Sequence, residues 1–153
     1  MRSTFFRQSL QHKIEIDGEN WDQGEKIKGK LIICNMSSET VVVNGSQVIL
    51  AYGVKKSIKE GNESPWEVLE KQVLTKNISL PAGGEQSYEW IFQLATDCPI
   101  TDKQGGLYLL FGGEDVLSEG GRLDLPVNLH QILQNFLQTF STQFFFLEKY
   151  QKR

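Results

Sequence analysis

Few side chains in this sequence could act as a catalytic nucleophile or as its general base. The chain of 153 residues has two histidines, His12 and His130, and two cysteines, Cys34 and Cys98. No histidine lies close to a cysteine in the sequence. There is also no Gly-x-Ser-x-Gly turn and no glycine loop of the kind that cradles phosphate. We therefore expect a protein that is not an enzyme and that carries no cofactor.

Acidic residues open one alternative chemistry, which is calcium binding. If the predicted strands run up and down, a group of carboxylates would come together on loops at one end of a β-sandwich. Clustered carboxylates can bind Ca²⁺, because this hard cation takes several oxygen ligands. The alternative function is therefore a calcium-dependent sandwich that binds lipid or carbohydrate, although no spacing among these residues is diagnostic. The residues concerned are Asp17, Glu19, Asp22, Glu60, Glu63, Asp97 and Asp102.

The overall composition argues against several other classes of function. The net charge is −3 at pH 7, so a basic face for nucleic acid is not expected. No apolar run approaches the ~18 residues of a membrane-spanning helix. The first residues lack the apolar core of a secretory signal. We therefore expect a cytoplasmic protein, in which Cys34 and Cys98 are better explained as two thiols than as a disulfide.

The elements that would position these side chains are mainly β-strands. Leu10, His12, Ile14 and Ile16 alternate with polar residues, as the apolar face of a half-buried strand does. Because His12 lies on that apolar face, we expect a packed histidine and not a ligand.

Residues 21–34 carry the strongest architectural signal in the chain. An aromatic residue and a glycine turn precede a strand whose apolar face includes Ile27 and Leu31, with Gly29 between them. A glycine inside a strand leaves a gap for a bulge or for a large neighbouring ring. Trp21 is the nearest ring that could fill this gap.

Further β segments follow, separated by turn residues. The segment that begins at Trp66 fits a strand or a helix, and its context favours a strand. Trp66 could bind sugar as an exposed ring, but packing beneath the neighbouring loop is the simpler explanation. Counting these segments, we expect roughly seven strands and no helix before about residue 125, the pattern of a sandwich or barrel. The predicted segments are residues 40–56, 66–80, 88–94, 107–111 and 122–127.

Residues 129–153 follow a different pattern. Apolar residues recur there at spacings of three and four, which predicts an amphipathic helix. Asn128 is its expected N-cap, with Gln131 as the reciprocal partner. So large an apolar face must cover the sandwich, contact a partner, or pair with a second copy of the chain. The candidate partner-binding side chains are Phe136, Phe140, Phe144, Phe145, Phe146 and Leu147.

The order of these features resembles the N-terminal sandwich domain of the arrestins. An aromatic residue, a Gly-Glu turn and a strand of the form apolar-x-Gly-x-apolar occupy residues 21–31. A long strand at 48–54, a Pro-Gly turn at 80–84, an alternating strand at 88–94 and a Pro-containing loop at 97–101 then follow in the family's order. Arrestin-like proteins usually carry two such sandwiches in tandem, and this chain resembles only the first.

Among arrestin-like proteins, the sequence is similar to the bacterial sporulation-control proteins and to the arrestin-like subunit of retromer. The resemblance implies an all-β, two-sheet immunoglobulin-like sandwich over residues 1–128, followed by the helical tail of residues 129–153. It also implies a non-enzymatic adaptor, scaffold or regulator that binds another protein.

Two further partner expectations come from the residues themselves. The chain could form a homodimer through the tail or through an edge strand, because an open sandwich leaves strand edges that can pair with another chain. The basic C-terminal end leaves peripheral association with a membrane surface open, with the run of phenylalanines as the second signal that stable anchoring needs.

Overall fold

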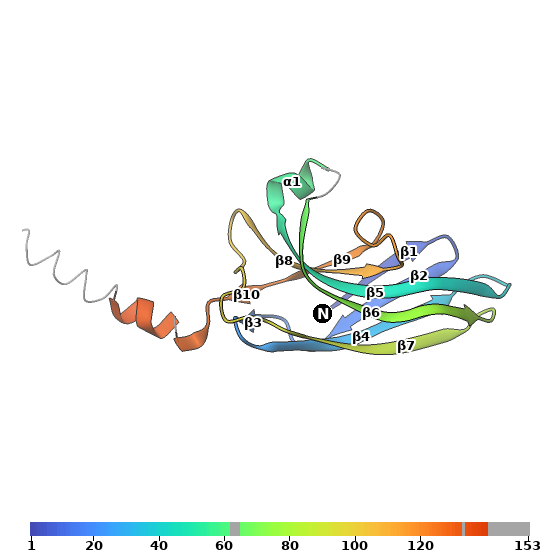
Figure 1. The fold of residues 1–153 in the computed structure, drawn as a ribbon, viewed down its shortest axis with the longest axis horizontal. Coiled ribbons are helices and arrows are strands. Elements are labelled where there is room, and N and C mark those ends of the chain that lie inside the picture. Colours follow the sequence, from blue (N-terminus) through green and yellow to red (C-terminus); the bar gives the residue numbers. More distant parts are fainter. Residues whose placement is uncertain (62–64, 133, 141–153) are drawn as a thin grey trace, which may run out of the picture.

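The computed structural model describes residues 1–61, 65–132 and 134–140. Two four-stranded antiparallel sheets pack as a β-sandwich, and a short parallel pair of strands lies at one end (Figure 1). The predicted all-β, two-sheet architecture is therefore confirmed. The first sheet runs in the order β1 (Arg2–Arg7), β2 (Leu10–Ile16), β4 (Lys26–Asn35) and β7 (Glu85–Gln93). The second runs in the order β6 (Trp66–Leu80), β5 (Val41–Val54), β8 (Gly105–Gly112) and β9 (Gly121–Leu125). The parallel pair is β3 (Trp21–Asp22) and β10 (Val127–Asn128).

The core lies between the two sheets and follows from the alternation of the strands. Ile14 of β2, Leu31 of β4 and Trp90 of β7 are buried on the inner face of the first sheet. They belong to one cluster with Val48 of β5 and Leu109 of β8 from the second sheet. Successive side chains of a strand point to opposite faces, so each strand places every second residue in this core.

The second sheet is also covered on part of its outer face. Tyr108 and Leu110 of β8 form a separate buried cluster there, against which Trp66 and Ile58 pack. The rings of Trp66 and Tyr108 meet edge to face, with centroids 5.1 Å apart. Trp66 is therefore a packing residue. Ile58 lies on the short helix α1 (Lys55–Lys59), so the expectation of no helix before about residue 125 is wrong. Five residues are too few to show a helical period in the sequence.

One further strand expectation needs correction. The described residues form ten strands, more than the roughly seven expected, and β1 was missed because Phe5 and Phe6 break its alternation. The Asn44-Gly45 step lies inside β5, which continues through it beside β6. Gly45 adopts φ +62° next to a register shift at Ser46, so the step is a bulge within one strand.

The gap at Gly29 is filled, but not by Trp21. A Cβ at Gly29 would lie 1.9 Å from the Glu15 carbonyl oxygen and 2.8 Å from the ring of Trp90. Trp21 instead packs against Gly18, where a Cβ would lie 3.1 Å from its ring. Sequence proximity suggested Trp21, whereas antiparallel pairing places Trp90 directly opposite Gly29.

Asn35 at the end of β4 fastens two loops to the sandwich. The side chain is 0% exposed. Its Nδ2 donates to the carbonyl oxygens of Glu39, Leu80 and Pro81 at 2.7, 3.0 and 3.0 Å. Its Oδ1 accepts from the backbone N–H and the hydroxyl of Ser37 at 2.9 and 2.8 Å. One amide thus satisfies backbone groups in the β4–β5 loop and at the end of β6.

The chain leaves the sandwich beside the β3–β10 pair. The Thr101 hydroxyl donates to the Leu125 carbonyl at 3.2 Å and accepts from the Val127 N–H at 3.0 Å, which fixes the route of the chain into β10. Residues 131–132 and 134–140 are then helical. Asn128, the expected N-cap, is instead part of β10. The cap is His130, whose Nδ1 accepts from the backbone N–H of Ile132 at 3.2 Å.

Candidate functional site

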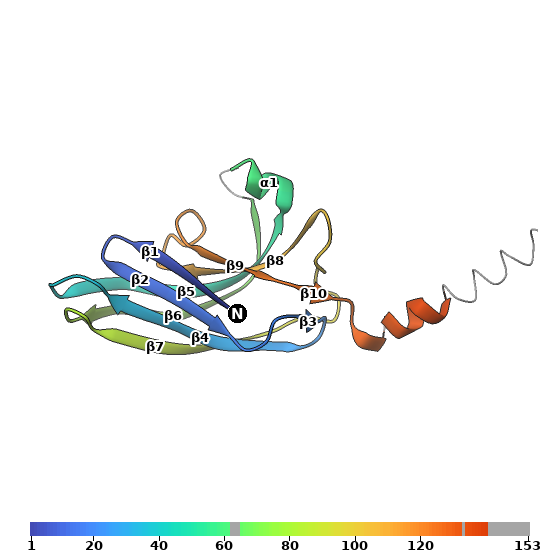
Figure 2. The same ribbon diagram turned by 180° about the vertical axis from the view of Figure 1, so that it is seen from behind.

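The C-terminal helix, described over residues 131–132 and 134–140, presents apolar side chains to solvent. It extends away from the sandwich at the β3–β10 end (Figures 1 and 2). Ile132, Phe136, Leu137 and Phe140 are 73, 63, 41 and 58% exposed. The rings of Phe136 and Phe140 stack with centroids 6.4 Å apart and planes 16° from parallel. Large apolar side chains gathered on one face of an exposed helix are typical of an interaction surface.

The described part of the helix does not cover a sheet. None of its described side chains is buried, and Gln134 alone among them is half-buried. Phe136 and Phe140 thus lie together on an exposed face, as the candidate residues were expected to. The other four candidates, Phe144, Phe145, Phe146 and Leu147, lie outside the described residues.

The base of the helix is fixed by Gln23, a residue that the sequence did not single out. This side chain is 7% exposed. Its Oε1 accepts from the His130 N–H at 3.1 Å, and its Nε2 donates to the Cys98 carbonyl. Its backbone N–H donates to the Asn128 carbonyl at 2.9 Å. One glutamine therefore ties the start of the helix to the body of the sandwich, so the helix leaves at a defined point.

A second exposed apolar area follows the edge strand β6. Val68, Leu69 and Val73 are 44, 38 and 56% exposed, and Ile91 on the neighbouring edge β7 is 52% exposed. The Gln72 side chain bridges the two edges by accepting from the Ile91 N–H at 3.3 Å. This edge offers backbone groups to another strand.

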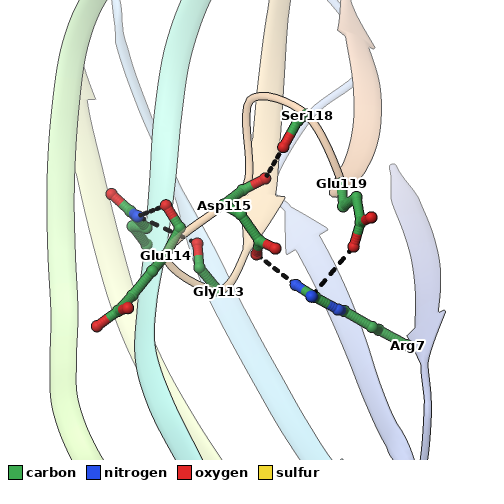
Figure 3. Close-up of polar contacts among 7 residues, drawn as sticks. Arg7, Gly113, Glu114, Asp115, Ser118 and Glu119 are labelled. Carbon is green, nitrogen blue, oxygen red and sulfur yellow. Dashed lines mark hydrogen bonds and ion pairs between the residues drawn. The ribbon is translucent and has the colours of Figure 1, made fainter.

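A charged cluster joins the end of β1 to the loop between β8 and β9 (Figure 3). The Arg7 guanidinium pairs with Asp115 and, at 3.1 Å, with Glu119. The hydrogen bond from Arg7 lowers the pKa of Asp115, and the same bond raises the pKa of Arg7. Gln47 donates to the carbonyls of Gly113 and Glu114, both at 3.1 Å. These contacts tie the loop between β8 and β9 to β1 and to β5.

His12 lies close to this cluster and is 3% exposed. The expectation of a packed histidine is therefore confirmed. Neither of its ring nitrogens has a hydrogen-bond partner among the described residues. Burial lowers the pKa of His12, and the positive charge of Arg7 lowers it further, so the ring is kept neutral. An unsatisfied buried polar group costs about 1–3 kcal/mol, which makes His12 an unusual core residue.

Among the described residues, the remaining reactive groups do not gather into a site. Burial raises the pKa of the Cys98 thiol, which holds it in the protonated, unreactive form. Among the described residues, no three His, Cys, Asp or Glu side chains are placed to hold a metal ion, so the calcium alternative gains no support. The Asp102 carboxylate instead accepts from the backbone N–H groups of Gln104 and Gly105 at 2.8 and 3.0 Å. No helix in the described part of the chain is long and apolar enough to span a membrane.

Comparisons with known proteins bear on the fold. No protein-family model matches the sequence, and no curated protein matches it. Among solved structures, Spo0M, a sporulation control protein from Bacillus subtilis, is similar with a TM-score of 0.71 at 14% identity, over 90% of this chain. A beta-glucosidase from Listeria innocua has a TM-score of 0.46 at 14% identity, over 82% of this chain and 17% of its own. The Pseudomonas fluorescens alkylpurine DNA glycosylase AlkC has a TM-score of 0.40 at 17% identity, over 77% of this chain and 30% of its own.

Of these three, the likeness to Spo0M has a TM-score high enough to support the fold. The similarity to the retromer subunit stays a prediction. The chain has an arrestin-like sandwich fold similar to that of Spo0M, and it spans 56% of that protein's length.

Proposed function

We propose that this protein is a non-enzymatic, cytoplasmic interaction module, an adaptor or regulator that binds a protein partner through its C-terminal helix. The single observation that carries the proposal is the exposed apolar face formed by Ile132, Phe136, Leu137 and Phe140. The fold shared with a sporulation control protein is consistent with a regulatory role.

The physical argument is the cost of leaving this face in water. Burying one large apolar side chain stabilises a contact by about 1.5–3 kcal/mol. Side chains at positions 132, 136 and 140 repeat every four residues and lie along one side of the helix. This is the pattern with which a helix inserts into an apolar groove of a partner. Gln23 fixes where the helix begins, so the sandwich holds the face clear of both sheets.

The test compares Phe136→Gln with the wild-type chain. A photoreactive phenylalanine analogue at position 132 would capture the partner in the native cell, and the captured protein would then be purified and titrated. Burying one phenyl ring contributes about 2 kcal/mol to the binding free energy, so its loss should weaken binding about 30-fold. Asn135→Ala is the matched control, because Asn135 is exposed on the polar side of the same helix. It should bind as the wild type does.

Two results would reject the proposal. One is a Phe136→Gln protein that binds the purified partner with unchanged affinity. The other is a wild-type chain that forms no protein cross-link but sediments with anionic lipid vesicles, which would favour the membrane alternative. Sedimentation equilibrium of the wild type would show whether the captured partner is a second copy of the chain.

A further inference from the structure

The outer face of the second sheet carries two hollows that lie side by side. One has a volume of about 470 Å³ and the other a volume of about 200 Å³. They share the loop residues Val116, Leu117 and Ser118 as a common wall. Trp66 lines the larger hollow, and Val68 lines the smaller one. The loop between β8 and β9 thus separates two adjoining recesses on one face of the sandwich.

Apolar side chains on the walls of these hollows are exposed to solvent. Val68 and Leu117 are 44 and 42% exposed. The walls are held in place from below, because the ring of Trp66 meets that of Tyr108 edge to face and Val116 is buried. Binding energy at protein interfaces concentrates where apolar anchors enter pockets with fixed walls. This face therefore has the character of a docking site.

The C-terminal helix has features that match the two hollows. The exposed rings of Phe136 and Phe140 lie one helical turn apart, with centroids 6.4 Å from each other. Two rings in this arrangement suit two adjoining recesses. Residues 129–140 contain no Asp, Glu, Lys or Arg, so the helix brings no charge against Lys71 and Glu114, which line the smaller hollow. Helices that select a different protein commonly do so with charged flanks, which this helix lacks.

The helix points away from the hollows of its own chain. Its start is fixed by Gln23, whose Oε1 accepts from the His130 N–H at 3.1 Å, and it extends outward at the β3–β10 end (Figures 1 and 2). A second copy of the chain would bury the helix face and the hollows in one kind of contact. Specific interfaces bury about 800 Å² on each partner, and reciprocal exchange doubles the area that one helix supplies.

We propose that two copies of this chain exchange their C-terminal helices, so that Phe136 and Phe140 of each copy pack against Trp66 and Leu117 of the other. The inference rests on the proposed function, because it names a second copy of the chain as the partner of the same helix face. Each copy supplies one helix and one pair of hollows, and the two equivalent contacts close a symmetric dimer.

Sedimentation velocity of the purified full chain measures the self-association. The wild type should form a dimer, and Phe136→Gln and Leu117→Glu should each raise its dissociation constant about tenfold or more, because every dimer of either variant has two damaged contacts. Both side chains are exposed, so neither substitution should disturb the fold. Met36→Glu is the matched control, because Met36 is exposed and lines neither hollow. It should dimerise as the wild type does.

A mixture of the two variants tests whether the proposed residues meet. In a mixed pair, both substitutions fall in one contact and the other contact is wild type. Substitutions of residues that touch are not additive, so the mixed pair should associate more tightly than either variant does with itself. A mixed pair that is no tighter, or a Leu117→Glu protein that dimerises as the wild type does, would overturn the inference.

A wild type that stays monomeric would overturn it as well. If that monomer still cross-links to a different protein through position 132, the exchange of helices is wrong and the proposed function stands.

Discussion

Replacing Asn35 by aspartate should destabilise the fold far more than its nearly identical shape suggests. The side chain is fully buried, and its Nδ2 faces three carbonyl oxygens, those of Glu39, Leu80 and Pro81. Aspartate keeps the Oδ1 acceptor for Ser37 but replaces the Nδ2 donor by an oxygen. Asn35→Asp therefore places a buried negative charge next to three hydrogen-bond acceptors and leaves every other heavy atom of the side chain unchanged.

The expected loss follows from counting hydrogens. An amide has two N–H groups, so three acceptors within 3.0 Å mean that one hydrogen is shared. Two lost hydrogen bonds account for about 2 kcal/mol, and the buried carboxylate oxygen that replaces Nδ2 and has no donor adds about 1–3 kcal/mol. The free energy of unfolding should therefore fall by about 3–5 kcal/mol, a large share of the 5–15 kcal/mol typical of a domain.

Urea denaturation followed by circular dichroism would measure this change. The midpoint should fall for Asn35→Asp while the slope stays constant, since the surface exposed on unfolding is the same. Asn77→Asp is the matched control, because Asn77 is exposed on β6 and gains the same charge. A loss below about 1 kcal/mol, or an equal loss in both variants, would refute the bonding assigned to Asn35.

Three further predictions concern Gly29, Thr101 and His12. Gly29→Ala should lower the free energy of unfolding, measured by urea denaturation, by about 3 kcal/mol or more, because the new Cβ would lie 1.9 Å from the Glu15 carbonyl oxygen. Gly113→Ala is the control and should change it little, because its Cβ would lie 3.6 Å from the nearest atom. Thr101→Val should lower stability by about 1–2 kcal/mol in thermal melts, since its hydroxyl joins two backbone groups; an unchanged melting curve would contradict that role. For His12, the folded pKa lies below the unfolded value of 6.5, so the unfolded chain binds the proton first. Stability should therefore decrease as the pH falls below about 6.5, and this decrease should be smaller in His12→Phe; identical pH profiles would refute the assignment.

The alternation of apolar and polar residues was sufficient to predict most strands. It placed Ile14 and Leu31 in the core. The segment that begins at Trp66 was ambiguous, and the surrounding β segments favoured a strand there. Such patterns can be recognised in the sequence because a sheet with one buried face imposes a period of two on the apolar residues of each strand. Helix α1 was missed because it has only five residues and lies on the surface.

The candidate site was only partly predictable. The spacing of Phe136 and Phe140 indicated an amphipathic helix, because helical periodicity is local. Whether that helix folds back over a sheet depends on contacts between distant residues. Gln23 lies within the turn pattern of residues 21–31, but nothing local in that pattern indicates that it holds the start of the helix through His130 and Cys98.

The sequence by itself determined the all-β class, the strand faces and the presence of an apolar tail. Only the tertiary structure showed that Trp90 fills the gap at Gly29, that Asn35 fastens two loops, and that His12 is buried with no hydrogen-bond partner among the described residues. The physical reason is that periodicity reports which face of an element is buried, but not what it is buried against. That depends on register and sheet order, which bring together residues far apart in the chain.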